Sequence, residues 1–197
     1  MDWNALGAWL YEDGIPNFTK LSAHKVKVVY VDPRSGNAAA TCSSLRGNSF
    51  TPGIYYVPQW FPGPTPQQHA KKVSDYVQVQ KLVQTGEPVM LDLEALSVPW
   101  VTAFLKSYRQ HLPTRPTAYT NAPFQNETVV PVDVLQQYGL HWYPQMYYGD
   151  MSPADPAAVM LEVTRIYPPE MVHPFYDGAC VPADARDGCI FTCERLP

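Results

Sequence analysis

Short apolar runs alternate along the chain with segments that have helical spacing, and this alternation restricts the possible folds more than any other feature. Two of the runs, VKVVYVD (26–32) and PVMLDLE (88–94), are apolar at nearly every position. Such runs are typical of parallel strands that helices cover. After the second run, Val101, Phe104 and Tyr108 fall on one face of a helix. The alternation predicts an α/β fold, a compact irregular (β/α) barrel of the TIM type in a single domain.

Seven strands are expected before residue 178, with some of the connecting helices reduced to loops. The expected strands are 5–11, 26–32, 53–60, 88–94, 116–121, 141–148 and 171–177. The expected helices are one through Ala23 capped by Asn17, one from Pro66 to about 83, one over 101–112, and one that starts at Asp155-Pro156. Residues 33–49 are expected to form a loop. A doubly wound open sheet is the alternative, but no Gly-rich phosphate loop is present.

The barrel is assigned to residues 1–178, and residues 179–197 to a Cys-bearing C-terminal tail packed on it. Three of the four cysteines are in this tail, so a disulfide such as Cys180 to Cys189 is one interpretation and free buried thiols are another. No cysteine or histidine spacing fits a zinc site, and neither a metal nor any other cofactor is expected.

The charge of the chain argues against several classes of partner. The formal net charge is −4, and no run of Lys or Arg exceeds Lys71-Lys72. Nucleic acid and anionic membranes are therefore not expected to bind. No stretch approaches the roughly 18 to 20 apolar residues of a membrane span. The first residues lack the pattern of a signal peptide, so we expect a protein that is cytoplasmic or is released by another route, as from a phage.

Polar and aromatic residues follow almost every expected strand. Chemistry in a (β/α) barrel takes place at these strand ends. The residues are Asp13, Asp32, Gln59, Trp60, Asp92, Glu94, Tyr119, Asn121, Gln145, Tyr147, Tyr176 and Asp177. Together they form one rim of acids, amides and aromatic rings. Such a rim suits a carbohydrate, because amides bind hydroxyl groups and flat rings contact the apolar face of a sugar.

Asp92 and Glu94 are the most informative pair on this rim. Alternate residues of a strand point the same way and lie about 6.6 Å apart, so both side chains should face the barrel axis, with Glu94 nearer the mouth. Burial beside a second negative charge raises the pKa of a carboxyl group. A raised pKa suits a general acid that protonates a glycosidic oxygen. We interpret Glu94 as this acid and Asp92 as its partner. The other reading is a structural acid pair bonded to backbone or Arg, or a cation site.

The runs around these strands resemble those of the glycoside hydrolase family 25 lysozymes, muramidases of bacteria and phages. The resemblance covers roughly residues 5–178 and is carried by GIPNFTKLSAHKVKVVYVD, PGIYYVPQW, PVMLDLE, PTAYTN and HWYPQMY, in that order. It implies an irregular (β/α) barrel with the glycan groove across the C-terminal ends of the strands. It also implies that Glu94 is the proton donor, with Asp92 beside it. The residues that it places near the sugar are Tyr55, Tyr119, Trp142, Gln145 and Tyr147.

The chain departs from that family at two acids, one on the first strand and one in an Asp-x-Asn pattern after the last strand, for which Asp177 is the nearest candidate here. The family has an aspartate on its first strand, in a pattern like Gly-x-Asp-x-Ser, where this chain reads GAWLY with Trp9 near that position. Asp13, Asp32 or Asp177 would have to supply the remaining acid. Met146-Tyr147-Tyr148 is also similar to a motif of the chitinase-like family 18 barrels, although these residues could equally fill the barrel. In that family the N-acetyl group of the substrate acts as the nucleophile, so one protein acid suffices.

Two functions follow from these patterns. The first is cleavage of β-1,4 bonds in peptidoglycan or a related N-acetylated glycan. The alternative is a barrel that binds glycan without cutting it, as part of a phage virion or another surface assembly. The Asp-x-Glu pattern of Asp92 and Glu94 favours the enzyme, and the absent acid near Trp9 favours the binding protein.

Overall fold

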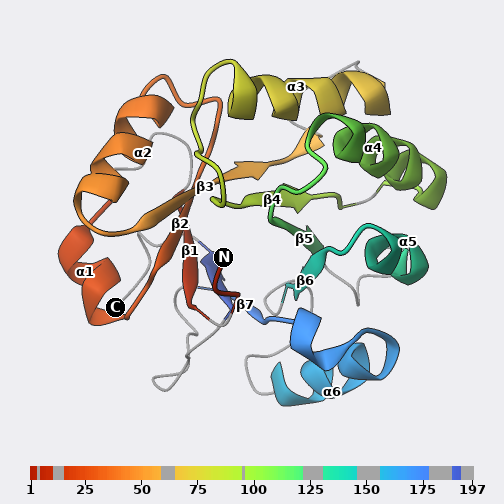
Figure 1. Cartoon of the computed structure of the whole chain (residues 1–197). Coiled ribbons are helices and arrows are strands. Elements are labelled where there is room, and N and C mark those ends of the chain that lie inside the picture. Colours follow the sequence, from red (N-terminus) through yellow and green to blue (C-terminus); the bar gives the residue numbers. More distant parts are fainter. Residues whose placement is uncertain are drawn as a thin grey trace.

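The computed structural model is a barrel of eight parallel strands surrounded by helices (Figure 1). The structure describes residues 1–3, 5–10, 16–58, 65–94, 96–121, 131–145, 156–177 and 188–191. Within them, the strands are β1 (Gly7–Leu10), β2 (Val28–Val31), β3 (Thr51–Tyr56), β4 (Val89–Asp92), β5 (Thr117–Asn121), β6 (His141–Pro144), β7 (Phe175–Asp177) and β8 (Cys189–Phe191). The helices are α1 (Phe18–Ala23), α2 (Ala38–Gly47), α3 (Pro66–Gln78), α4 (Val98–His111), α5 (Val132–Gln137), α6 (Pro156–Ile166) and the 3-10 helix η2 (Pro169–Met171).

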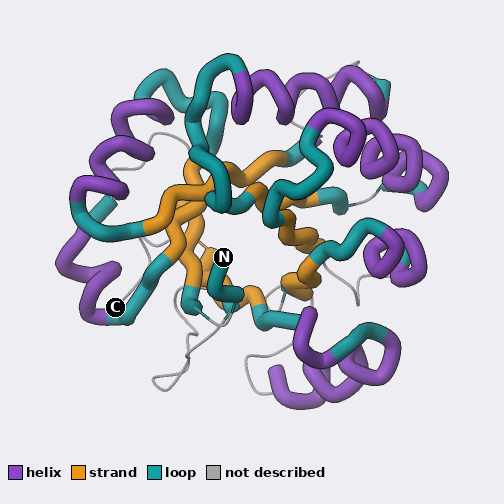
Figure 2. The backbone as a smooth tube through the Cα atoms, in the orientation of Figure 1, coloured by secondary structure: helices purple, strands orange, loops and turns teal. Residues whose placement is uncertain are grey.

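The strands follow one another around the ring in chain order. The sheet order is β6-β5-β4-β3-β2-β1-β8-β7, and every pairing is parallel. Two further parallel bridges, Trp142 with Val172 and Gln145 with Phe175, connect the two ends of this sheet. Figure 2 shows the strands as the inner ring and the helices outside it. The predicted single-domain, TIM-like (β/α) barrel is confirmed.

Two clusters of buried side chains lie on opposite faces of the strands. The outer cluster joins strand residues such as Leu91 to helix residues such as Leu45 and Phe104, so it fills the layer between sheet and helices. The inner cluster contains no helix residue and therefore fills the barrel. It consists of Trp9, Val28, Tyr30, Tyr55, Val57, Met90, Ala118, Tyr143 and Phe175, with Trp3 packed against it. Strands buried on both faces explain why their sequences are apolar at nearly every position.

The helix starts have the local signals that the sequence predicted. The Asn17 side chain accepts a hydrogen bond from the Lys20 N–H and caps α1. Thr65 and Gln68 form a reciprocal capping box at the start of α3, followed by a proline at its first turn. These interactions satisfy N–H groups that have no partner inside the helix.

Three elements differ from the sequence-based expectation. Helix α2 lies within the segment that was expected to be a loop. The sequence did not predict it, because its apolar face consists of only Ala38, Cys42 and Leu45 among small and polar residues. Helix α5 was not expected at all. Part of the segment expected to be a tail, 179–197, forms β8 inside the sheet between β1 and β7. The sheet therefore includes residues beyond the boundary drawn at 178, since β1 and β7 need a strand between them to complete the ring.

The exact ends of several strands and the state of Cys42 also became known only from the structure. Strand β3 ends at Tyr56, β6 ends at Pro144, and the expected strand 171–177 begins in η2 and is regular only from Phe175. Cys42 is a free, buried thiol in α2. Cys180 lies outside the described residues, so its pairing with Cys189 stays a prediction. Among the helices described, none has the length and apolar character needed to cross a bilayer.

Candidate active site

Strand β4 carries two carboxyl groups to the C-terminal end of the barrel. Asp92 is the last residue of β4 and pairs in register with Thr120 of β5. It alternates with Met90, which belongs to the inner cluster, so Asp92 is on the inner side of the strand. The Asp92 side chain is buried at 7% relative exposure, whereas Glu94 is half-buried. The burial difference agrees with Glu94 lying nearer the mouth of the barrel.

Asp92 is held by a tyrosine from the neighbouring strand. The Tyr55 hydroxyl donates a 2.6 Å hydrogen bond to Asp92 Oδ2, and the Tyr55 ring stacks on Trp9 with centroids 4.3 Å apart. Burial raises the pKa of Asp92 well above its usual value, and the negative charge of Glu94 raises it further. The hydrogen bond from Tyr55 lowers the pKa only in part. Asp92 therefore retains its proton to a higher pH than an exposed aspartate does.

Glu94 is held by an amide from β6. Burial raises the pKa of Glu94, and a hydrogen bond from the Gln145 side chain partly opposes that rise. The Gln145 backbone N–H donates to the Asn121 carbonyl at 2.9 Å, and Gln145 itself is 1% exposed. The side-chain Oε1 of Gln145 has no hydrogen-bond partner among the described residues. Its amide nitrogen is therefore the group that donates to Glu94.

Asn121, Tyr119 and Trp142 lie behind this pair, and the structure corrects the role expected for Trp142. Trp142 and Tyr119 belong to the outer cluster and are 0% exposed. The Trp142 Nε1–H donates to Asn121 Oδ1 at 3.0 Å. Trp142 therefore supports Asn121 and has no face open to a sugar. The reason is the alternation along β6, which turns Tyr143 into the barrel and Trp142 out of it.

Tyr119 is buried close to the two acids. Burial raises the pKa of its hydroxyl, and the charges of Asp92 and Glu94 raise it further. The Asn121 amide lies close enough to oppose that rise, but the Tyr119 hydroxyl and Asn121 Nδ2 make no hydrogen bond of ordinary geometry with any described residue. Asp92 Oδ1 and Gln145 Oε1 also have no hydrogen-bond partner among the described residues. The described strand ends therefore hold four buried polar atoms without such a partner. Buried polar groups normally have partners, so these four atoms mark the most polar part of the described strand ends.

Asp32 is not available as the remaining acid. It is 1% exposed and accepts hydrogen bonds from Arg34 Nε at 3.0 Å and from the Arg34 backbone N–H at 2.8 Å. The guanidinium and the carboxylate form an ion pair over the turn that follows β2. The cause is local, because an arginine that donates to both carboxylate oxygens fixes the orientation of the carboxylate.

The remaining expected residues are only partly placed. Asp13, Gln59, Trp60 and Tyr147 lie outside the described residues, and Asp177 is placed on β7 without a described side chain. Tyr176 is half-buried and follows Phe175 of the inner cluster, so it is on the other side of the strand. The described residues contain no group of three or more His, Cys, Asp or Glu side chains that could hold a metal ion.

The sequence did not predict that Trp9 packs inside the barrel against Tyr55. It marked Trp9 only as the place of an absent acid, whereas the structure places it at 2% exposure in the barrel, stacked on Tyr55. The run GAWL contains no signal for this, because β1 is buried at all four positions. Trp9 forms the floor beneath the carboxyl pair, and no carboxyl group is contributed by this position.

No family model matches the chain, and no curated protein is similar to it in sequence. Solved structures do have a similar fold. Concanavalin B matches with a TM-score of 0.60 at 11% identity, over 97% of this chain and 93% of that chain. Fructose-bisphosphate aldolase from Campylobacter jejuni matches at 0.56 and 9% identity, over 95% and 70% of the two chains. Oxaloacetate acetylhydrolase in complex with oxalate matches at 0.56 and 10% identity, over 98% and 76%. These similarities show the TIM-like barrel fold alone.

Proposed function

We propose that this barrel is a glycoside hydrolase-like enzyme that cleaves β-1,4 bonds of peptidoglycan or a related N-acetylated glycan. The observation that carries the proposal is the Asp92–Glu94 pair, where burial raises both pKa values at the C-terminal end of β4. Catalytic acids need a pKa near the working pH, and buried acid pairs at this end of a barrel are candidates for that role.

Glu94 is the proton donor in this proposal. It protonates the glycosidic oxygen as the bond from that oxygen to the anomeric carbon breaks, and it becomes a carboxylate. Its half-buried position gives it access to a substrate that the deeper Asp92 lacks. The hydrogen bond from Gln145 fixes the orientation of the Glu94 carboxyl group and stabilises the carboxylate once the proton has left.

The nucleophile is the carbonyl oxygen of the substrate's own acetamido group. It bonds to the anomeric carbon as the leaving oxygen departs, and a water molecule later displaces it while giving a proton to the Glu94 carboxylate. Two observations support this route over a second protein acid. Trp9 occupies the inner side of β1, and Asp32 is paired with Arg34. Asp92, held by Tyr55, is the partner of Glu94 in this proposal. Asp13 and Asp177 remain the candidates for a conventional second acid.

Release of reducing ends from purified peptidoglycan tests the proposal. We expect activity in the wild type and a loss of about 100-fold or more in Glu94→Gln, because the proton donor is removed. Glu162→Gln is the matched control, since Glu162 is exposed on α6. Circular dichroism must show that both variants are folded. Equal activity in Glu94→Gln and the wild type would rule out Glu94 as the acid.

A non-catalytic glycan-binding barrel is the second candidate, and the aromatic floor made by Trp9 in place of an acid favours it. It predicts no reducing ends from any variant, together with co-sedimentation of the folded protein with peptidoglycan. Asp92→Asn and Glu94→Gln would then weaken co-sedimentation with peptidoglycan, and no variant would differ from the wild type in release of reducing ends.

A further inference from the structure

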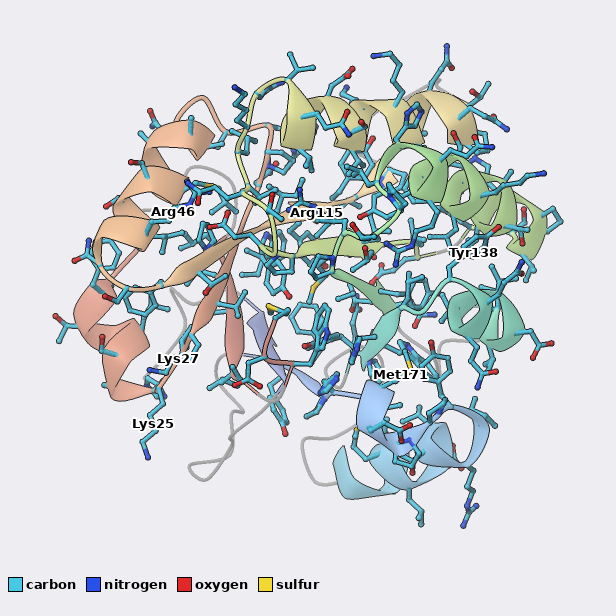
Figure 3. All side chains as sticks on the ribbon, in the orientation of Figure 1. Lys25, Lys27, Arg46, Arg115, Tyr138 and Met171 are labelled. Atoms are coloured by element: carbon cyan, nitrogen blue, oxygen red, sulfur yellow. The ribbon has the colours of Figure 1, made fainter. Side chains whose placement is uncertain are left out.

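A cavity of about 390 Å³ opens at the opposite end of the barrel from the carboxyl pair. Its walls come from the connection between α4 and β5, the connection between α5 and β6, and the N-terminal residues. The residues that matter for its chemistry are Trp3, Arg109, Arg115, Thr117, Tyr138 and His141. Thr117 and His141 are the first residues of β5 and β6, so this is the end where the strands begin. Arg115 and Tyr138 are labelled in Figure 3.

The cavity is positively charged although the protein as a whole is acidic. Arg109 and Arg115 both line it, and none of the described residues that line it is Asp or Glu. The chain carries a formal net charge of −4. Two like charges beside one cavity therefore form a local positive field that an anion would reduce.

Backbone carbonyl groups hold both guanidinium groups in place. Arg109 donates to the carbonyl oxygens of Arg115 at 2.8 Å, Tyr138 at 2.9 Å and Leu112 at 3.4 Å. Arg115 Nη1 donates to the carbonyl oxygens of Gln84 and Glu87. These contacts orient the two side chains without neutralising them. A carboxylate would have neutralised them, and none among the described residues accepts a hydrogen bond from either arginine.

Glu87, the carboxylate whose charge acts on Arg115, is itself bonded to another arginine. Its two carboxylate oxygens accept hydrogen bonds from Arg46 at 2.7 and 2.6 Å, and one of them also accepts from the Gln84 backbone N–H. Burial lowers the pKa of Arg109 and Arg115, as expected for cations that lack a close carboxylate. Glu87 only partly opposes this at Arg115.

Among the described residues, both arginines have N–H donors that make no hydrogen bond. A guanidinium group has five N–H donors, of which Arg109 uses three and Arg115 two in the contacts above. A tetrahedral oxyanion accepts from such donors in pairs. The carbonyl contacts have already fixed the side chains, so little conformational entropy remains to be lost on binding.

One wall of the cavity is flat and aromatic. The Trp3 and His141 rings stack with centroids 4.1 Å apart and planes at 16°. A hydrogen bond of 2.9 Å joins His141 Nδ1 to His173 Nε2 and holds the imidazole against the β7 side of the barrel. A planar group attached to the anion would contact this wall.

We propose that the cavity between Arg109, Arg115 and the Trp3–His141 wall is a second ligand site, which binds a phosphate- or sulfate-type oxyanion, free or on a small aromatic molecule. The site is separate from the proposed glycosidase site, because it lies at the other end of the strands. Its ligand would stabilise the two connections that the arginines already join.

Calorimetric titration with inorganic phosphate, sulfate and phenyl phosphate at constant ionic strength tests the proposal. We expect saturable binding with a Kd of about 1 mM or below, and tighter binding of phenyl phosphate if the aromatic wall takes part. Arg115→Gln should weaken phosphate binding by about ten-fold or more, since it removes one charged fork. Lys27→Gln is the matched control, because Lys27 is an exposed cation that lines the neighbouring cavity.

A second measurement does not depend on any variant folding. Chemical-shift mapping of the wild type with phosphate should move the signals of Trp3, Arg115, Thr117 and Tyr138 and leave those of β4 unchanged. Absence of saturation in the wild type, or equal weakening in Lys27→Gln and Arg115→Gln, would overturn the proposal. Shifts spread over the whole surface would do the same. Glu94→Gln should bind phosphate like the wild type, so failure of the glycosidase proposal and failure of this one are distinguishable.

Discussion

The Tyr55 hydroxyl donates a 2.6 Å hydrogen bond to Oδ2 of Asp92 between adjacent strands of the barrel. The other oxygen, Oδ1, has no hydrogen-bond partner among the described residues. One oxygen of the carboxyl group is thus fixed by a side chain from the neighbouring strand, and the Glu94 backbone also acts on the carboxyl group as a hydrogen-bond donor. This arrangement affects the orientation and the pKa of Asp92, and substitutions of either Tyr55 or Asp92 test it.

Removing the hydroxyl should raise the pKa of Asp92 further. Tyr55→Phe keeps the stack on Trp9 but leaves a buried carboxyl group without its donor. We expect a loss of about 1–2 kcal/mol in the free energy of unfolding at neutral pH, measured by urea denaturation. A double-mutant cycle with Asp92→Asn separates the pair from the rest of the site. Additive effects of the two substitutions would show that the bond contributes nothing to stability.

Asp92→Asn should stabilise the protein at neutral pH while it reduces glycan cleavage. Because the folded-state pKa lies well above the usual 3.8, ionising Asp92 costs stability, and this cost disappears as the pH falls toward that usual value. The gain should therefore be present at neutral pH and shrink toward pH 4. Thermal melts at neutral pH and near pH 4 check this, with the exposed Asp133→Asn as control. A gain of equal size at both pH values would contradict the argument.

The histidine pair should give the opposite pH dependence. Burial, and then the charge of His173, lowers the pKa of His141 from 6.5 to about 4. The unfolded chain therefore binds the proton first, and the free energy of unfolding should fall as the pH drops from 6.5 toward 4. His141→Asn should flatten this slope in denaturation curves measured across that range. His111→Asn, exposed at the end of α4, should leave the slope as it is in the wild type.

Replacing two glycines by alanine should change the free energy of unfolding in opposite directions. A Cβ atom at Gly53 would lie 2.6 and 2.8 Å from the Tyr30 ring inside the barrel, whereas one at Gly47 would meet nothing within 4 Å. Overpacking in Gly53→Ala should cost about 1–3 kcal/mol of unfolding free energy. Gly47→Ala, at the end of α2, should gain up to about 1 kcal/mol from helix propensity. Denaturation of both variants checks the pair, and similar midpoints would show that the barrel relaxes around Tyr30.

Elements with strong local signals were predictable from the sequence. Apolar runs such as 26–32 and 88–94 became β2 and β4, and the capping residues Asn17 and Thr65 start α1 and α3 as expected. Helix α2 was missed because Ala and Cys make a weak apolar face. Strand β8 was missed because three residues carry no usable period, and its place depends on pairing with β1 and β7.

The sequence by itself determined the class of fold, the order of the seven strands before residue 178, and the position of Asp92 and Glu94 at the end of a buried strand. It could not determine which face of each strand points inward. A strand that is buried on both faces is apolar on both, so it has no alternation to read. Only the closed barrel turned Tyr55 toward Asp92 and Trp142 away from the site. Likewise, only tertiary contacts brought Gln145 to Glu94, because these two residues are far apart in the chain. Arg109 and Arg115 are close in sequence, but their cavity also needs Tyr138, His141 and the N-terminal residues as walls.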